Sequence, residues 1–252
     1  MFNVFQNFFY SIYKKWIFRK IDSADISELN SEMIVDPELL LLGNFLHKND
    51  IAFDIGTNVG EYTYVLERYV GPENVYSFEP IPALFKTLKK RFKNVIVEPM
   101  ALSNKSGSSQ FKIPIINGIV LQTPGKLDLG IIEPGEINYE IIEVQCNTID
   151  EYVNRKAIPM IKFLKIDVEG HEVQVLKGGI KTINRSRPIM LIEIEQRHHL
   201  MPIATIFEFI KELGYEIKFY SIKERRYVDV ESFDIIKHQD YNNINSLEYI
   251  NN

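Results

Sequence analysis

Residues 53–61, Phe-Asp-Ile-Gly-Thr-Asn-Val-Gly-Glu, lead from an apolar run into a helical pattern, and they constrain the fold more than any other segment. Asp54 ends a predicted strand, and Gly56 and Gly60 allow a tight turn that a ligand can approach closely. Glu79 ends the next apolar run, about 20 residues further on, where an acid can accept hydrogen bonds from a ribose. The sequence therefore predicts a nucleotide-cofactor site at the carboxyl edge of a parallel sheet.

The spacing of the glycines indicates which cofactor fits. A dinucleotide site has three glycines as G-x-G-x-x-G, which bring backbone amides against a pyrophosphate. Here Asn58 stands in place of the middle glycine, and Asp54 would repel a pyrophosphate. The same acid suits the ammonium of an amino-acid moiety, and S-adenosylmethionine carries such a group together with a ribose and no phosphate. We expect S-adenosylmethionine; the alternative is a strand–turn–helix connection with incidental glycines.

Composition limits the classes of partner. The 252 residues include 29 basic and 34 acidic side chains, so the chain lacks the basic excess of a nucleic-acid-binding protein. Cys146 is the only cysteine, which excludes an intrachain disulfide and fits a reducing, cytoplasmic compartment. Cys146 could be a nucleophile, but its apolar segment favours packing. At 45% hydrophobic content, one domain with a small appendage accounts for the length.

The first 20 residues are rich in aromatic side chains and predict an amphipathic helix. Basic residues follow the apolar run rather than precede it, unlike a signal peptide, and the run is too short and too polar to span a bilayer. We expect a lid or docking helix, with peripheral membrane contact as the alternative. The expected organisation is an N-terminal helical extension over 1–35, the main domain over 36–235 and a polar tail over 236–252.

The middle of the chain alternates between apolar, strand-like runs and helical patterns, which is typical of a parallel sheet with crossover helices. Residues 100–148 are more irregular, and 215–220 with 227–230 predict an antiparallel pair near the end. Ligands of open α/β sheets bind beyond the carboxyl ends of the strands. The acids at or near such ends are Asp54, Glu79, Asp167, Glu193 and Glu195.

Five motifs in order point to one family. They are Phe53-Asp-Ile-Gly-Thr-Asn-Val-Gly-Glu-Tyr-Thr63, Phe78-Glu-Pro80, Ala101-Leu-Ser103, Thr148-Ile-Asp-Glu151 and Leu164-Lys-Ile-Asp-Val-Glu-Gly-His-Glu172, the last followed by Val175-Leu-Lys-Gly178. Over about residues 50–195 the chain resembles the FkbM-type methyltransferases, a branch of the S-adenosylmethionine-dependent class I enzymes. The resemblance implies a Rossmann-like, doubly wound α/β fold with a mostly parallel sheet of seven strands, and methyl transfer, usually to a hydroxyl oxygen.

The resemblance also implies roles for individual residues. Asp54, Gly56, Asn58 and Gly60 would surround the methionine part of the cofactor, and Glu79 would take the ribose hydroxyls. Three consecutive residues would line the adenine, with simple core packing as the alternative: Met100, Ala101 and Leu102.

Asp167, Glu169 and His171 alternate on the segment that leaves the strand 161–167. A hydroxyl acceptor must lose a proton, which requires a general base or a metal that lowers the pKa of the hydroxyl. His171 is the leading base by its intrinsic pKa; the alternative is a histidine held by hydrogen bonds at a helix N-terminus. An extended segment would place all three side chains on one side, and a helix that begins at Gly170 would break that grouping.

Metal catalysis is the competing mechanism. Asp167 with Glu193 or Glu195 could hold magnesium, which prefers carboxylate oxygens, although no closely spaced ligand motif requires it. His198 and His199 form another candidate site, or only a polar loop.

The resemblance, together with the acidic net charge, implies O-methylation of a hydroxyl on a sugar, a surface-glycan precursor or a secondary metabolite. The alternatives are N-methylation of a small amine or amide and a catalytically inactive binding protein. The Asn/Asp-Pro-Pro-Tyr/Phe pattern of base-amino methyltransferases is absent, and the missing glycine argues against a dehydrogenase.

Overall fold

The computed structural model describes residues 42–116, 119–120, 126–127, 138–221, 224, 226–239 and 248–251. The chain divides into two compact units, Met1–Phe45 and Leu46–Asn252. In the first unit the described element is a short 3₁₀ helix, η2 (Leu42–Asn44). The predicted N-terminal helix therefore lies outside the described residues, and so does its expected membrane contact. Among the described helices, none is long and apolar enough to cross a membrane.

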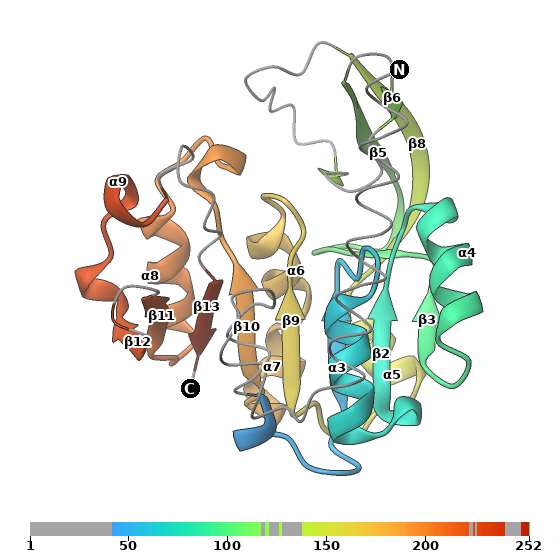
Figure 1. Cartoon of the computed structure of the whole chain (residues 1–252), viewed down its shortest axis with the longest axis horizontal. Coiled ribbons are helices and arrows are strands. Elements are labelled where there is room, and N and C mark those ends of the chain that lie inside the picture. The colour runs from blue at the N-terminus through green and yellow to red at the C-terminus, as the bar shows by residue number, and fades with distance from the viewer. Residues whose placement is uncertain are drawn as a thin grey trace. The chain divides into compact units, whose positions relative to one another are not determined.

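The second unit is built on a mostly parallel sheet (Figure 1). Its parallel strands are β1 (Ala52–Ile55), β2 (Val75–Phe78), β3 (Ile96–Glu98), β9 (Phe163–Ile166) and β10 (Ile189–Glu193). Every residue of β1 and β9 is buried, as expected for central strands that are covered on both faces. The predicted α/β class is thus confirmed, and β1 is the middle one of these five parallel strands, with β2 and β9 as neighbours.

The described sheet has eight strands, in the order β12-β11-β13-β10-β9-β1-β2-β3, where seven were expected. β11 (Ile217–Ser221) and β12 (Arg226–Asp229) form the predicted antiparallel pair. β13 (Glu248–Asn251) comes from the segment expected to be a polar tail, and it pairs antiparallel with both β10 and β11. Backbone pairing does not require an apolar pattern, so the Asn-rich composition concealed this strand.

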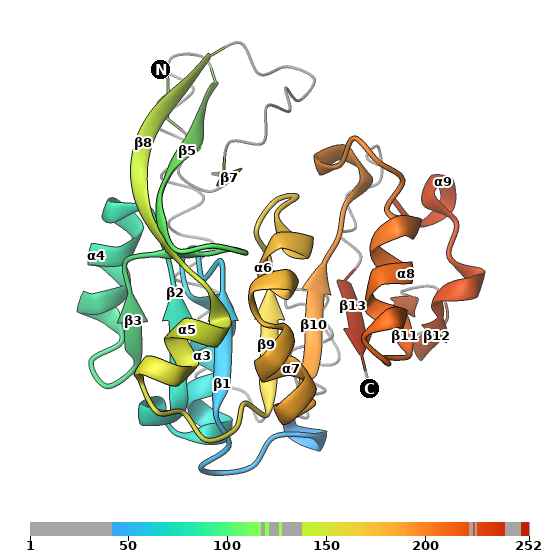
Figure 2. The ribbon, with the colours of Figure 1, turned by 180° about the vertical axis from the view of Figure 1, so that it is seen from behind.

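Helices cover both faces of the sheet (Figures 1 and 2). α3 (Glu61–Val70) lies on the face of Asp54, because Thr63 of α3 donates a hydrogen bond to that carboxylate. α5 (Ile149–Arg155) lies on the opposite face, where Tyr152 packs edge-on against Phe53. The remaining helices are α4 (Pro82–Arg91), α6 (Glu172–Gly178), α7 (Ile180–Ser186), α8 (Ala204–Glu212) and α9 (Ile235–His238). The fold is therefore doubly wound, as predicted.

The segment predicted to be irregular contains a second sheet. β5 (Gly107–Ile116) and β8 (Asn138–Asn147) form a long antiparallel pair, which β4 (Ala101–Leu102), β6 (Ile119–Val120) and β7 (Lys126–Leu127) extend. Phe111 and Val144 of this sheet pack against Ile81 and Leu84 at the start of α4. The pair is thereby anchored beside the carboxyl ends of β2 and β3.

Candidate functional site

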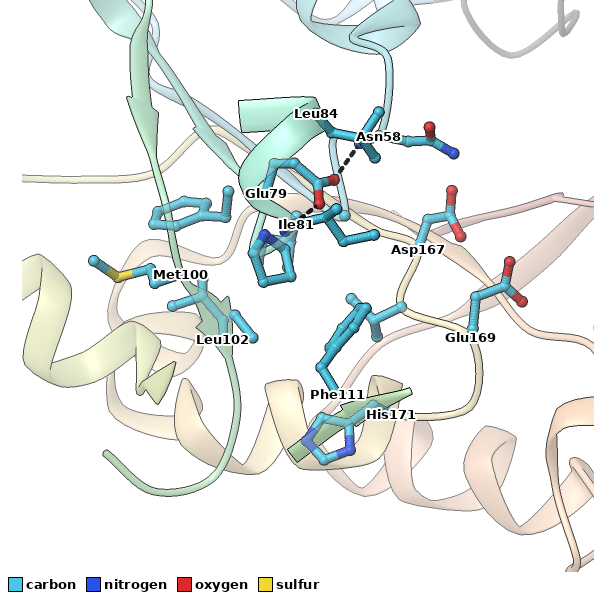
Figure 3. Close-up of a pocket in the computed structure, with 16 residues that line it drawn as sticks. Asn58, Glu79, Ile81, Leu84, Met100, Leu102, Phe111, Asp167, Glu169 and His171 are labelled. Atoms are coloured by element: carbon cyan, nitrogen blue, oxygen red, sulfur yellow. Dashed lines mark hydrogen bonds between the residues drawn. The ribbon is translucent and has the colours of Figure 1, made fainter. Parts of the chain in front are cut away.

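A pocket opens at the carboxyl edge of the sheet (Figure 3). Nine of the residues singled out in the sequence line it: Gly56, Asn58, Glu79, Met100, Ala101, Leu102, Asp167, Glu169 and His171. The lining does not include Asp54, Gly60, Glu193 or Glu195. Phe111 also lines the pocket, and sequence reasoning missed it because it lies on a strand of the segment that was expected to be irregular.

Glu79 is the most constrained acid in the pocket. The residue is 4% exposed, and its carboxylate accepts hydrogen bonds from two backbone N–H groups, Asn58 N to Oε2 and Ile81 N to Oε1, both at 2.8 Å. Burial raises the pKa of Glu79 to about 7, although the two hydrogen bonds oppose this shift. A carboxylate held in this way has a fixed orientation and keeps lone pairs for further donors.

The glycine loop is shaped by backbone packing. Gly56 has φ of +79°, and a Cβ atom added there would lie 1.7 Å from the carbonyl oxygen of Asp167. At Gly60, φ is +89°, and a Cβ would meet the side chains of Leu88 and Phe92. The two glycines therefore let this loop pass close to the β9 end and to α4, a role beyond the ligand approach that the sequence suggested.

Asp54 lies beneath the pocket and not in its wall. Its side chain is fully buried, and Oδ2 accepts a 2.6 Å hydrogen bond from the Thr63 hydroxyl. Oδ1 lies 3.7 Å from Nζ of Lys165, which also pairs with Asp167 Oδ2 at 3.0 Å. Burial alone would lower the pKa of Lys165, but Asp167 and Asp54 hold it above its ordinary value. The resulting chain of charges fixes Asp167 at the pocket edge.

An apolar wall faces Glu79. Met100, Ala101 and Leu102 contribute one side of it, with β4 formed by the last two, and Phe111 contributes another. Ala101 and Leu102 are almost fully buried, so they pack in the core as well as line the pocket. Both interpretations of this segment are compatible with the geometry.

His171 stands apart from Asp167 and Glu169. Glu169 and Gly170 both have positive φ, of 50° and 91°, so the chain turns before His171 caps α6. Figure 3 shows the carboxylates of Asp167 and Glu169 turned away from the His171 ring. The single-sided grouping expected of an extended segment does not form.

The His171 ring is instead tied to the β4 end of the fold. It is 6% exposed, and Nε2 lies 2.9 Å from the Ser103 hydroxyl. A Cβ added at Gly178 of α6 would lie 2.0 Å from the Ser103 carbonyl oxygen, so helix and loop are in close contact. Burial lowers the pKa of His171 to about 4, so the ring is neutral at ordinary pH.

The acids after β10 are arranged differently from the expected metal set of Asp167 with Glu193 or Glu195. Within the described part of the chain, the residues with converging ligand atoms are Glu169, Glu195 and His198. His199 points elsewhere and pairs with Glu172 at 3.1 Å. Cys146 is partly buried against the apolar cluster of the second sheet, which confirms the packing interpretation.

Comparison with known proteins is consistent with this geometry. Residues 54–217 match the family model of the methyltransferase FkbM domain. The hexuronic acid methyltransferase AglP of Haloferax volcanii is 29% identical over 176 residues, which cover 67% of this chain and 64% of that protein. The chain thus spans less than two thirds of the length of this curated relative.

Solved structures with some likeness include the methyltransferase FkbM from Methylobacillus flagellatus, with a TM-score of 0.49 and 15% identity over 80% of this chain and 43% of that one. Another is the TehB-like S-adenosylmethionine-dependent methyltransferase from Corynebacterium glutamicum, with a TM-score of 0.43 and 12% identity over 96% of each chain.

Proposed function

The chain belongs to the FkbM methyltransferase family, and on this premise we propose that it transfers the methyl group of S-adenosylmethionine to an oxygen of a carbohydrate. The observation that carries the proposal is the Glu79 carboxylate, fixed by two backbone N–H groups at the edge of an apolar pocket. A ribose diol can donate two hydrogen bonds to such a carboxylate, and an adenine fits the apolar wall beside it.

Different pocket residues contact different parts of the cofactor. Glu79 takes the ribose, and Met100, Ala101 and Leu102 contact the adenine together with Phe111. Gly56 and Asn58 lie on the side of the methionine part. Asp54 and Gly60 support this loop from below, since neither lines the pocket.

The acceptor binds beside Asp167 and Glu169, the two lining carboxylates on the side away from the adenine wall (Figure 3). Bound S-adenosylmethionine supplies an electrophilic methyl group, and a hydroxyl acceptor must lose its proton as it takes that group. His171 is a weak candidate for this proton, because Ser103 occupies its Nε2 atom and burial lowers the pKa of the ring to about 4. We therefore assign His171 a positioning role, and place proton removal at the Asp167–Glu169 edge.

One relative supports the proposed acceptor class. Its name describes a hexuronic acid methyltransferase, and a sugar acid or another sugar fits the expected carbohydrate acceptor. No feature of the described pocket favours an amine over an oxygen acceptor. The cytoplasmic location, expected from the single cysteine, stays a prediction.

Calorimetric titration with S-adenosylmethionine and S-adenosylhomocysteine tests the cofactor site. We expect micromolar binding by the native protein, and about 10-fold weaker binding or worse by Glu79→Gln, which removes one of the two oxygen acceptors. The matched control is Glu73→Gln, an exposed acid on the preceding 3₁₀ helix η3 (Pro72–Asn74). Equal affinity in native and Glu79→Gln protein would remove the main support. Methyl-labelled cofactor with uronic-acid and neutral sugar acceptors then tests the substrate class.

A further inference from the structure

Three side chains from two loops converge at one point next to the pocket. Glu169 follows β9, and Glu195 and His198 follow β10, with His198 at the end of the 3₁₀ helix η4 (Gln196–His198). His198 Nε2 lies 2.5 Å from Glu169 Oε2 and 3.1 Å from Glu195 Oε2. His198 is 6% exposed, so its imidazole is buried in the protein interior.

A simple histidine–carboxylate pair does not account for this arrangement. Nε2 carries at most one hydrogen, yet it faces carboxylate oxygens from two different side chains. Two carboxylate oxygens and one imidazole nitrogen therefore share one point among the described residues.

We propose that Glu169, Glu195 and His198 bind one divalent transition-metal cation of the manganese type. Two carboxylate oxygens and one imidazole nitrogen form a mixed set, suited to manganese and its neighbours rather than to magnesium alone. Ligand atoms about 2.1 Å from an octahedral metal lie about 3 Å apart, close to the 2.5 and 3.1 Å separations seen here. Arg197 now donates to two of these ligands, from Nε to Glu195 Oε2 at 2.5 Å and to His198 Nε2 at 3.0 Å. A bound cation would have to displace this side chain, which is 47% exposed.

This site differs from the set expected in the sequence. Asp167 pairs with Lys165 and is not in the converging group, and Glu193 is also outside it. His198, which the sequence offered only as one of two loop histidines, supplies the nitrogen ligand. Three protein ligands leave coordination positions open, as catalytic metal sites require.

The role of the cation rests on the proposed function. Glu169 is shared between the converging group and the pocket lining, so a bound cation would face the acceptor. It would attract the oxygens of a sugar acid that Asp167 and Glu169 alone would repel, and it would lower the pKa of a bound hydroxyl. Proton loss would then need no histidine base.

The test is titration of chelator-treated full-length protein with Mn²⁺, followed by the electron paramagnetic resonance signal of free Mn²⁺. We expect one ion per chain, and affinity reduced about 10-fold or more in both Glu169→Gln and His198→Gln. Glu169 is partly exposed, so its variant keeps the test valid if the buried His198 substitution impairs folding. His199→Gln is the matched control, because His199 is adjacent and pairs with Glu172 instead.

Absence of Mn²⁺ binding, affinity unchanged in both Glu169→Gln and His198→Gln, or an equal loss in His199→Gln would overturn the inference. Calorimetry with S-adenosylmethionine on the same metal-free protein separates the two proposals. Cofactor binding without Mn²⁺ binding refutes the metal site and leaves the proposed function intact. Mn²⁺ binding without cofactor binding refutes the cofactor site and leaves the metal site intact.

Discussion

Lys165 and Asp167 form an ion pair of 3.0 Å at the carboxyl end of β9, with the lysine side chain only 6% exposed. The same Nζ atom lies 3.7 Å from Oδ1 of the fully buried Asp54 at the end of β1. One buried cation thus links the acids of the two central strands. The ion pair also orients the Asp167 side chain at the pocket edge.

Lys165→Met is expected to reduce the free energy of unfolding by about 3 kcal/mol, because it leaves Asp54 buried beside a second carboxylate with no cation. Denaturant unfolding measures this change. Lys162→Met, at an exposed position just before the same strand, is the control and is expected to change stability by less than about 0.5 kcal/mol. Equal effects of the two substitutions would show that the ion pair contributes no net stability.

Cofactor affinity is expected to depend on pH through Glu79. Its pKa in the cofactor-free protein is about 7, and only the carboxylate can accept donors at both oxygens. Affinity should therefore fall as pH decreases below 7, by up to about 10-fold per unit. Calorimetry between pH 6 and 8 measures the slope, and binding near pH 7 should release a proton. A slope that persists in Glu79→Gln would assign the titration to another group.

The same group affects stability with a definite sign. Because the pKa of Glu79 is raised by folding from 4.5 to about 7, the folded state binds more protons than the unfolded state between these values. Stability contributed by this group therefore decreases as pH rises through that window. The difference in melting temperature between native protein and Glu79→Gln, measured from pH 4.5 to 8, should shift in favour of the variant at higher pH. A constant difference would contradict the raised pKa.

His171→Gln is expected to lower the rate of methyl transfer by less than about 10-fold, because the ring is a positioning group tied to Ser103. Loss of a general base costs roughly 100- to 10,000-fold. The profile of rate against pH should keep its shape near neutrality, since the His171 ring is neutral there, with a pKa of about 4. Ser103→Ala, which removes the partner hydroxyl, should give a loss of similar size. A loss above 100-fold in His171→Gln alone would restore the base assignment.

Gly56→Ala is expected to destabilise the protein by more than about 3 kcal/mol, because positive φ and a clash with the Asp167 carbonyl act together. Gly107→Ala is the control. Gly107 also has positive φ, of 132°, but an added Cβ there would contact nothing within 4 Å. Gly107→Ala should reduce the free energy of unfolding by roughly 1–3 kcal/mol, the range typical of backbone strain. Similar melting curves for the two variants would argue against the close approach at Gly56.

The sequence by itself determined the alternation of elements, and with it the fold class and the edge of the sheet where ligands bind. The ligand-binding edge can be identified because apolar strands are followed by acids, and parallel strands bring their carboxyl ends to one edge. These acids are Asp54, Glu79 and Asp167. These features are local, and local patterns encode them.

Only the tertiary structure decided which of these acids face the pocket and which support it. Asp54 and Glu79 both follow apolar runs in the sequence, yet Asp54 is paired beneath the pocket and Glu79 lines it. Positive φ at Glu169 and Gly170 turns the chain before His171, a backbone conformation that side-chain alternation cannot reveal. The convergence of Glu169 with His198 joins loops after different strands. Side-chain direction depends on backbone torsions and on partners distant in the chain, so no pattern along the sequence specifies it.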